Sequence, residues 1–301
     1  MLAIPYMGSK RKIAPQIVDF IHLRHPKAKY FYDVFGGGGA VSFYAIQQHY
    51  FNKVIYNELN TGVVELLKKI VNDGVTDDFF KWVSRDEFHA LKDGNCWRSG
   101  LVKTCWSFGN NQKDYLFGED IEEPKRLLHE MIINNCMTSR AEFKKLYGLN
   151  IELNEVGLFG VKEETITQKR IRIMKQVKNH TKGKYELQQL EQLEQLERLQ
   201  RLEQLQRLEI LNLSYEKVEF DTEPSETIIY LDPPYFNTAK YQESIDHDEF
   251  YNWVEELKNR GFHVYISSYE SHLDCVLEIE HNCTLSATAN NKVIEKLFYA
   301  G

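Results

Sequence analysis

The chain has 301 residues, of which 43% are hydrophobic and 27% charged, and this composition fits a globular enzyme and excludes a disordered chain. An uninterrupted apolar run of about 18 residues is absent, so a membrane span is excluded. The start, MLAIPYMGSKRK, has its basic cluster after a very short apolar stretch, which is the wrong order for a secretory signal, so none is expected. The formal net charge of −7 argues against a generally basic nucleic-acid binder, although a local basic patch can still bind phosphates.

Strands and helices are expected to alternate in the first part of the chain. The aromatic and β-branched run 30–35 predicts a strand that ends in the glycines 36–39, and a helical pattern follows over 40–46. A second strand is expected over 53–58 and a second helix over 61–70. Strand, glycine turn, helix, strand and acidic residue in this order are typical of the start of a parallel α/β sheet.

The alternation is lost in the middle of the chain. Residues 71–160 mix aromatic, glycine, asparagine and basic residues, which indicates an inserted unit with its own small, partly helical fold. A helix rich in Lys and Arg is expected over 165–179.

The rhythm of strands and helices then resumes. A short buried strand is expected over 228–231, a helix over 248–258 and another strand over 262–267. We expect segments 284–287 and 296–299 to form a closing antiparallel pair.

A repeat occupies residues 185–211, where nine leucines recur at every third position from Leu187 to Leu211. Its composition favours a helix, but three residues cover about 300° of an α-helix, so the leucines circle it. A coiled-coil seam needs a spacing of about 3.5 residues, which excludes a simple zipper. We interpret the repeat as a low-complexity helix. The alternatives are a helix wrapped by other elements, a non-α solenoid turn and a surface that binds a partner.

Charge is divided between two neighbouring segments. Residues 162–184 contain eight Lys or Arg and two Glu, a local charge of +6, whereas residues 185–226 contain eleven acidic and four basic residues, a local charge of −7. Charge runs are most often solvated helix faces. The basic segment becomes a candidate patch for the DNA backbone only if another part of the chain carries nucleic-acid chemistry.

The segment from Asp33 to Gly39 lies at the first expected strand-to-helix turn. Glycines there allow close approach of a ligand to the backbone, and the start of the helix offers free N–H groups. An acid at the end of the next strand, Glu58, can bind the two hydroxyls of a ribose. A GxGxxG pattern is missing, so a nucleoside-like ligand is expected rather than a dinucleotide.

The sharpest motif is Asp232-Pro233-Pro234-Tyr235, which follows a buried strand and therefore lies at the edge where α/β sheets bind ligands. Two prolines fix a rigid, extended turn that holds the Asp side chain and a backbone carbonyl side by side as acceptors. An amino group donating to both would have its lone pair directed outward, and the tyrosine offers a flat face for its ring. The alternative is a proline-rich exit loop with a packing tyrosine.

Three motifs occur here in the order found in Dam-type DNA adenine methyltransferases: Tyr6-Met7-Gly8-Ser9-Lys10, Phe35-Gly36-Gly37-Gly38-Gly39 and Asp232-Pro233-Pro234-Tyr235. The chain resembles this α-group family, of the kind carried by bacteria and phages. The resemblance implies an α/β fold: a Rossmann-like S-adenosylmethionine-dependent methyltransferase sheet with an inserted, mostly helical target-recognition domain. Residues 1–70 and 161–301 would form the catalytic domain, and 71–160 the target-recognition insertion.

The resemblance also implies roles for individual residues. Lys10 would lie near the cofactor carboxylate, Asp33 and the glycines around the methionine part, and Glu58 at the ribose. The full cofactor set is Tyr6, Gly8, Lys10, Asp33, Phe35, Gly36, Gly37, Gly39, Glu58, Ser214, Tyr215 and Asp232. Glu58 stands where the family usually has Asp, and Ser214 stands where it often has Asp before an aromatic residue.

The implied reaction is methyl transfer to the N6 amino group of an adenine flipped out of double-stranded DNA. Asp232 and the Pro233 carbonyl would accept the two N–H bonds, and Tyr235 would stack on the base; the catalytic set is Asp232, Pro233, Pro234 and Tyr235. Phosphate contacts would be made by Arg140, Lys144, Lys145, Lys169, Arg170 and Arg172. The candidates for reading a base are Trp106, Asn110, Asn111 and Arg140.

Double-stranded DNA and S-adenosylmethionine are the expected partners, with a restriction endonuclease acting on the same site as a further candidate. No metal is expected, because the histidines lack ligand spacing and the five cysteines form no CxxC pair, which fits a reducing cytoplasm. A monomer or weak dimer without membrane contact is expected. The alternatives are an RNA adenine or DNA cytosine-N4 methyltransferase and a catalytically silent DNA- or protein-binding relative. A protein glutamine methyltransferase would be expected to carry Asn in place of Asp232.

Overall fold

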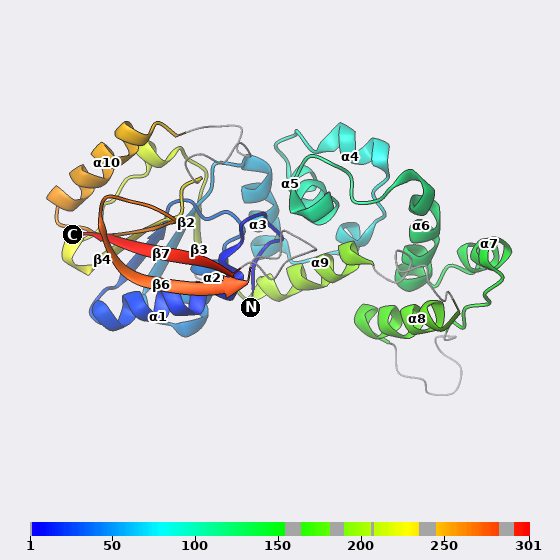
Figure 1. Cartoon of the computed structure of the whole chain (residues 1–301). Coiled ribbons are helices and arrows are strands. Elements are labelled where there is room, and N and C mark those ends of the chain that lie inside the picture. Colours follow the sequence, from blue (N-terminus) through cyan, green and yellow to red (C-terminus); the bar gives the residue numbers. More distant parts are fainter. Residues whose placement is uncertain (1, 154–163, 181–189, 206–207, 235–244, 283–291) are drawn as a thin grey trace.

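A computed structural model describes residues 2–153, 164–180, 190–205, 208–234, 245–282 and 292–301. Figure 1 shows two parts that lie side by side, a sheet covered by helices and a lobe made only of helices. The sheet has seven strands in the order β3-β2-β1-β4-β5-β7-β6. Helices long and apolar enough to cross a membrane do not occur in these ranges.

The seven strands come from two separate runs of the chain: β1 (Tyr30–Asp33) and β2 (Lys53–Asn57) before the helical lobe, and β3 (Leu208–Leu211), β4 (Thr227–Leu231), β5 (His263–Ser268), β6 (Asp274–Asn282) and β7 (Lys292–Ala300) after it. β3, β2, β1, β4 and β5 run parallel, and β7 pairs antiparallel with both β5 and β6. This architecture confirms the predicted α/β fold and five of the predicted strands.

The predicted closing pair is confirmed in part. Residues 296–299 lie in β7 and pair antiparallel with both β5 and β6. β6 begins ten residues before the predicted strand at 284–287. Residues 284–287 themselves lie outside the described residues.

Helices cover both faces of the sheet because successive strand residues point to opposite sides. Phe31 packs on the face covered by α1 (Ala14–Arg24), α2 (Ala40–Gln48) and α3 (Thr61–Asp73). Tyr32, the next residue, packs on the face covered by α10 (His247–Asn259). In Figure 1, α10 and α1 accordingly lie on opposite sides of the strands.

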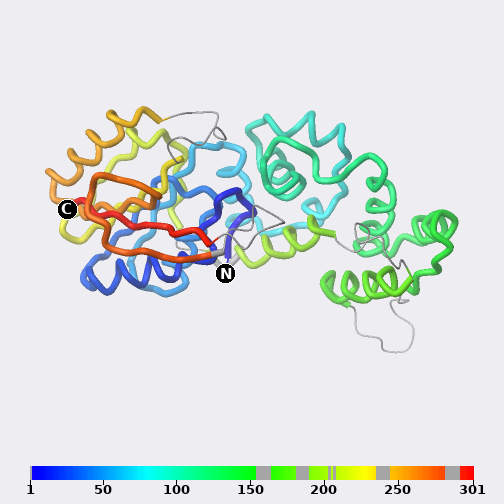
Figure 2. The backbone as a smooth tube through the Cα atoms, viewed as in Figure 1, coloured from blue at the N-terminus to red at the C-terminus, as the bar shows by residue number. Residues whose placement is uncertain are grey.

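The helical lobe contains α4 (Arg85–Leu91), α5 (Trp97–Cys105), α6 (Glu119–Asn134), α7 (Met137–Tyr147), α8 (Ile166–His180) and α9 (Glu191–Leu199). Its core holds Trp106, which is fully buried and has its ring centroid 5.0 Å from that of Trp82. α8 packs on α6 and α9 packs on α5, so both belong spatially to this lobe. Figure 2 shows the chain returning along α9 toward the sheet.

The leucine repeat is not one helix, so the prediction of a single low-complexity helix is wrong beyond Leu199. α9 continues into a 3₁₀-helix over Gln200–Gln204, and the repeat ends in the edge strand β3. A 3₁₀-helix has about three residues per turn, which returns leucines spaced by three to one side. From Leu193 to Leu199 the row of leucines in α9 shifts by about 120° around the helix before the 3₁₀ turn begins. The described leucines before β3 are all buried: Leu190, Leu193, Leu196, Leu199, Leu202 and Leu205.

The two parts of the molecule meet where α3 packs on α5. A Cβ added to Gly100 would lie 1.9 Å from the carbonyl oxygen of Gly62, and one added to Gly62 would lie 3.2 Å from the Gly100 nitrogen. The obstacle at Gly100 is backbone, which cannot move aside as a side chain can. Glycine at this position therefore allows the helical lobe to approach the sheet part closely.

We expect Gly100→Ala to lower the free energy of unfolding by about 1–3 kcal/mol, because overpacking outweighs the better helix propensity of alanine. Thermal or urea unfolding measures this change. Gly118→Ala is the control, because its added Cβ meets only a side-chain oxygen of Asp120, at 2.9 Å. A Gly100→Ala variant as stable as the wild type would show that the two helices do not need this contact.

Candidate active site

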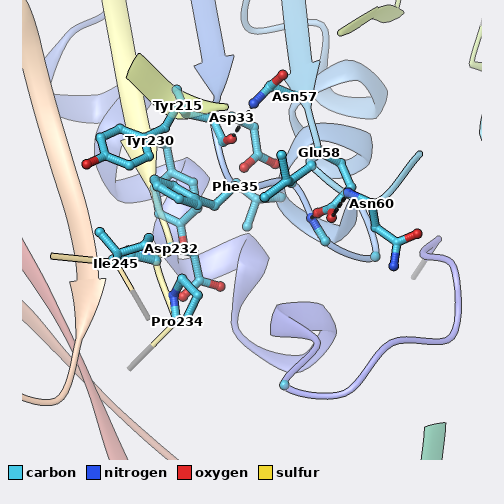
Figure 3. A pocket seen from close by; sticks show the side chains of 18 of the residues that line it. Asp33, Phe35, Asn57, Glu58, Asn60, Tyr215, Tyr230, Asp232, Pro234 and Ile245 are labelled. Carbon is cyan, nitrogen blue, oxygen red and sulfur yellow. Dashed lines mark hydrogen bonds between the residues drawn. The ribbon is translucent and has the colours of Figure 1, made fainter. Parts of the chain in front are cut away.

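A cavity of about 660 Å³ opens beyond the carboxyl ends of β1, β2, β3 and β4, the edge where α/β sheets bind ligands (Figure 3). Gly39 does not line it, and Tyr235 lies outside the described residues. The other predicted cofactor and catalytic residues all line this cavity: Tyr6, Gly8, Lys10, Asp33, Phe35, Gly36, Gly37, Glu58, Ser214, Tyr215, Asp232, Pro233 and Pro234.

Internal packing explains two of the glycines in the turn after β1. A Cβ added to Gly36 would lie 2.2 Å from the ring of Tyr56, and one added to Gly39 would lie 2.2 Å from the ring of Phe43. Gly39 also has a φ of +73°, which disfavours other residues. These two positions therefore require glycine whether or not a ligand is near.

Glu58 is held in place by two backbone N–H groups. Gly37 donates to its Oε2 and Asn60 donates to its Oε1, each at 2.8 Å. Burial raises the pKa of Glu58, and these hydrogen bonds oppose the rise. An ionised carboxylate has about four acceptor positions, so two N–H donors leave capacity for a ligand. Its place at the cavity suits a donor pair such as vicinal hydroxyls.

Asp33, the last residue of β1, has one oxygen that needs a partner. Its Oδ2 accepts hydrogen bonds from the N–H and the hydroxyl of Ser42, at 3.2 and 2.6 Å. Its Oδ1 is buried and has no hydrogen-bond partner among the described residues. Burial raises the pKa of Asp33 to about 7 despite the bonds from Ser42. A buried acceptor without a partner is costly, so a ligand with an N–H or ammonium group would stabilise this site.

Lys10 is a buried cation between two carboxylates. Its Nζ lies 2.8 Å from Oδ1 of Asp232 and 3.5 Å from Oε1 of Glu295, a residue of β7. Burial lowers the pKa of Lys10, but the two carboxylates raise it more, so the ammonium stays charged. For Asp232 the effect of burial has the opposite sign: burial raises the pKa of Asp232 to about 6, and Lys10 opposes the rise.

Aromatic rings form one wall of the cavity. The ring centroids of Phe35 and Tyr215 lie 5.6 Å apart, and Phe250 of α10 packs on both. Ser214, which precedes Tyr215, makes a hydroxyl contact with the carboxylate of Glu216. This wall offers apolar faces to a planar ring and has acidic oxygens beside it.

Asn57 was missed in the sequence, although it is central to the geometry of the site. Its Nδ2 donates to the carbonyl oxygens of Val34 and Leu213, both at 2.9 Å, and its Oδ1 accepts from the Leu213 N–H. The segments that follow β1 and β3 are thereby joined through the end of β2. A polar residue closing an apolar strand directly before Glu58 was the available signal.

Asn60 connects the cavity to the helical lobe and was also missed. Its Oδ1 caps α3 by accepting from the N–H of Val63 at 3.3 Å. The same oxygen accepts from the ammonium of Lys103 on α5 at 3.2 Å. Its Nδ2 donates to Oε1 of Gln112 at 3.3 Å. The pattern Asn-Thr-Gly at a helix start signals a cap, but not a contact with residues so far along the chain.

The predicted DNA-binding residues fall into two groups. Lys144 and Lys145 are exposed in the last turn of α7. Arg170 instead pairs with two acids of the leucine repeat, Glu194 at 2.8 Å and Glu197 at 2.9 Å. The acidic repeat therefore neutralises part of the basic segment beside it.

The other basic and base-reading candidates are also placed by the structure. Arg172 pairs with Glu164 at 2.8 Å, while Lys169 and Arg140 are half-buried. Trp106 is 0% exposed, so its candidacy for reading a base is wrong. An aromatic residue in a helical insertion is as well suited to a core as to a surface, and here it packs inside.

The model of the family described as D12 class N6 adenine-specific DNA methyltransferase matches residues 6–276. The chain belongs to this family. It is also 28% identical, over 156 residues, to the Type II methyltransferase M.MjaIII of Methanocaldococcus jannaschii. That match covers 48% of this chain and 51% of the relative, so the chain spans about half the length of the curated relative it matches.

The D12 match confirms the family indicated by the three motifs. It includes both runs of chain that build the parallel strands, and the helical lobe between them. No group of three or more His, Cys, Asp or Glu that could hold a metal ion occurs within the described part of this D12 methyltransferase.

We expect Asp33→Asn to stabilise the ligand-free protein more at about pH 8 than at about pH 5. The folded pKa of Asp33, about 7, lies above that of an unfolded Asp, so its contribution to stability is present at low pH and is lost as pH rises toward 7. Asparagine cannot ionise and can still accept from Ser42. The difference in melting temperature between variant and wild type should therefore grow with pH.

Asp86→Asn, at an exposed acid of α4, is the control and should show no such trend. A difference for Asp33→Asn that is the same at both pH values would contradict the assignment of a buried, ionising carboxyl.

Proposed function

We propose that this protein transfers a methyl group from S-adenosylmethionine to the N6 amino group of an adenine in double-stranded DNA, after the base is flipped into the cavity beside Asp232. The observation that carries the proposal is that one cavity holds hydrogen-bond acceptors suited to a cofactor and others suited to an amine substrate. Asp33 and Glu58 suit a cofactor, and Asp232 on its Pro-Pro turn suits an amine. Family membership agrees with this reaction.

The residues of the cavity fit S-adenosylmethionine, which supplies an electrophilic methyl group when bound. The unpartnered Oδ1 of Asp33 suits the ammonium of the methionine part. Glu58 suits the ribose hydroxyls, and the wall formed by Phe35 and Tyr215 suits the adenine ring. The implied proximity of Lys10 to the cofactor carboxylate stays a prediction, since its ammonium contacts Asp232 and Glu295.

Asp232 would accept one N–H of the target amine, and the carbonyl oxygen of Pro233 the other. Two acceptors on one side draw the nitrogen lone pair out of conjugation with the ring and direct it toward the methyl group. Rigid proline backbone keeps both acceptors in place, so the reaction depends on orientation and complementary charge more than on a strong base. Tyr235 would stack on the base.

We propose that residues 1–70 and 161–301 supply catalysis and that the helical lobe selects the DNA. Because α8 and α9 pack within that lobe, we propose that target recognition extends past residue 160 to the end of α9. Lys144, Lys145, Lys169 and Arg140 would contact phosphates, and Arg170 and Arg172 would brace the lobe.

The relative from Methanocaldococcus jannaschii is named as a Type II methyltransferase. We propose that the present protein modifies one defined DNA sequence. We also propose that a restriction endonuclease acts on the same sequence. The methyltransferase would act in the cytoplasm as a monomer or a weak dimer.

Asp232→Ala should abolish methyl transfer but leave DNA binding measurable, because it removes an acceptor for the amine and no phosphate contact. Methylation-aware sequencing of plasmid DNA from cells expressing either form tests this. Adenine N6 marks in one short motif, present with the wild type and absent with the variant, are expected. Equal loss of transfer and binding would mean that Asp232 shapes the fold. Marks on cytosine, or tritiated methyl in RNA or nowhere, would favour the other functions.

The double variant Lys144→Gln, Lys145→Gln should weaken binding to all DNA sequences. It should also reduce the slope of log K against log salt by about 2, because two phosphate contacts are lost. Fluorescence anisotropy over a salt series measures the slope. Lys258→Gln, which removes an exposed cation of α10, is the control. A change confined to one DNA sequence would refute the assignment.

A further inference from the structure

Glu295 is a charged residue inside the sheet. It lies in β7, its side chain is 3% exposed, and it does not line the cavity. A buried carboxylate is costly unless it is paired, and here its Oε1 lies 3.5 Å from the Lys10 ammonium. An apolar residue would fill this core position at lower cost. The acid therefore has a use that packing alone does not explain.

The arrangement of the three side chains indicates what that use is. The Lys10 Nζ lies 2.8 Å from Oδ1 of Asp232 and 3.5 Å from Oε1 of Glu295, so two carboxylates share its ammonium. The Asp232 side chain keeps 19% exposure and lines the cavity, whereas Lys10 is only 8% exposed. Because Glu295 also binds the Lys10 ammonium, it limits how far that ammonium can cover the carboxylate of Asp232, which faces the substrate.

We propose that Glu295 is a positioning residue for methyl transfer: it holds the Lys10 ammonium to one oxygen of Asp232 and so leaves the rest of that carboxylate available to the target amine. This inference rests on the proposed function. Glu295 does not line the cavity, so it acts on the reaction through the position of Lys10 and through its own charge.

The charge of Glu295 has a second consequence, for ionisation of Asp232. Besides Lys10, the titratable groups that face this cluster are Asp33, Tyr230 and Tyr269. Burial and the nearby charge of Glu295 both raise the pKa of Asp232, while Lys10 lowers it. Without Glu295, the ammonium is shared by one carboxylate instead of two. The pKa of Asp232 then falls, and its remaining charge is more fully neutralised.

The test is Glu295→Gln in the full-length protein, with single-turnover methylation of the DNA sequence that the wild type modifies. The rate constant should fall about 10- to 100-fold, the scale expected when a reacting group is misplaced. The acidic limb of its pH profile should move to lower pH, because Asp232 ionises more easily.

Two variants separate positioning from folding. Glu278→Gln removes an exposed acid from the neighbouring strand β6 and should keep the wild-type rate and pH profile. Glu295→Asp restores the charge and should return the acidic limb to its wild-type position with part of the rate, even if Glu295→Gln is too unstable to assay.

A wild-type rate for Glu295→Gln, or a lower rate with the acidic limb unmoved, would overturn the inference, as would an acidic limb displaced in Glu295→Asp. Failure of the proposed function looks different: the wild type itself would then methylate no DNA.

Discussion

The described part of the site depends on placing two buried carboxylates and a half-buried third at one sheet edge, beside the buried ammonium of Lys10. Asp33, Glu58 and Asp232 converge there because parallel strands end side by side, and each loses solvation. Each is compensated differently: Glu58 by two backbone N–H groups, Asp33 by one serine on α2, and Asp232 by Lys10. The compensation is incomplete at Asp33, and an incompletely satisfied acceptor is what a cationic ligand can exploit.

The same edge joins the two parts of the molecule. Asn60 contacts both Lys103 of α5 and Gln112, while its own N–H bonds to Glu58. A few polar atoms thus span the distance from the acid at the cavity to the lobe proposed to select DNA. Their bonds are short-range and directional, so a displacement of the lobe must alter the cavity mouth or break them.

Much of this could be predicted because its signals are local. The strand before the glycine turn, the helix after it and the Asp-Pro-Pro-Tyr turn are each specified by neighbouring residues. β3 was not foreseen, since a leucine-rich sequence favours helix and only pairing with β2 makes it a strand. The role of Arg170 was hidden for a related reason: its partners, Glu194 and Glu197, lie on another helix, and a charge run does not reveal which of its members are already paired.

Sheet order has a consequence for how the molecule comes together in time. β6 precedes β7 in the chain but lies outside it at the edge, and its only described strand partner is β7. During synthesis β6 therefore emerges before the strand it must pair with. Lys10 is synthesised long before Glu295, its second partner, which lies in β7. The charge balance of the site is therefore incomplete until β7 pairs with β5 and β6.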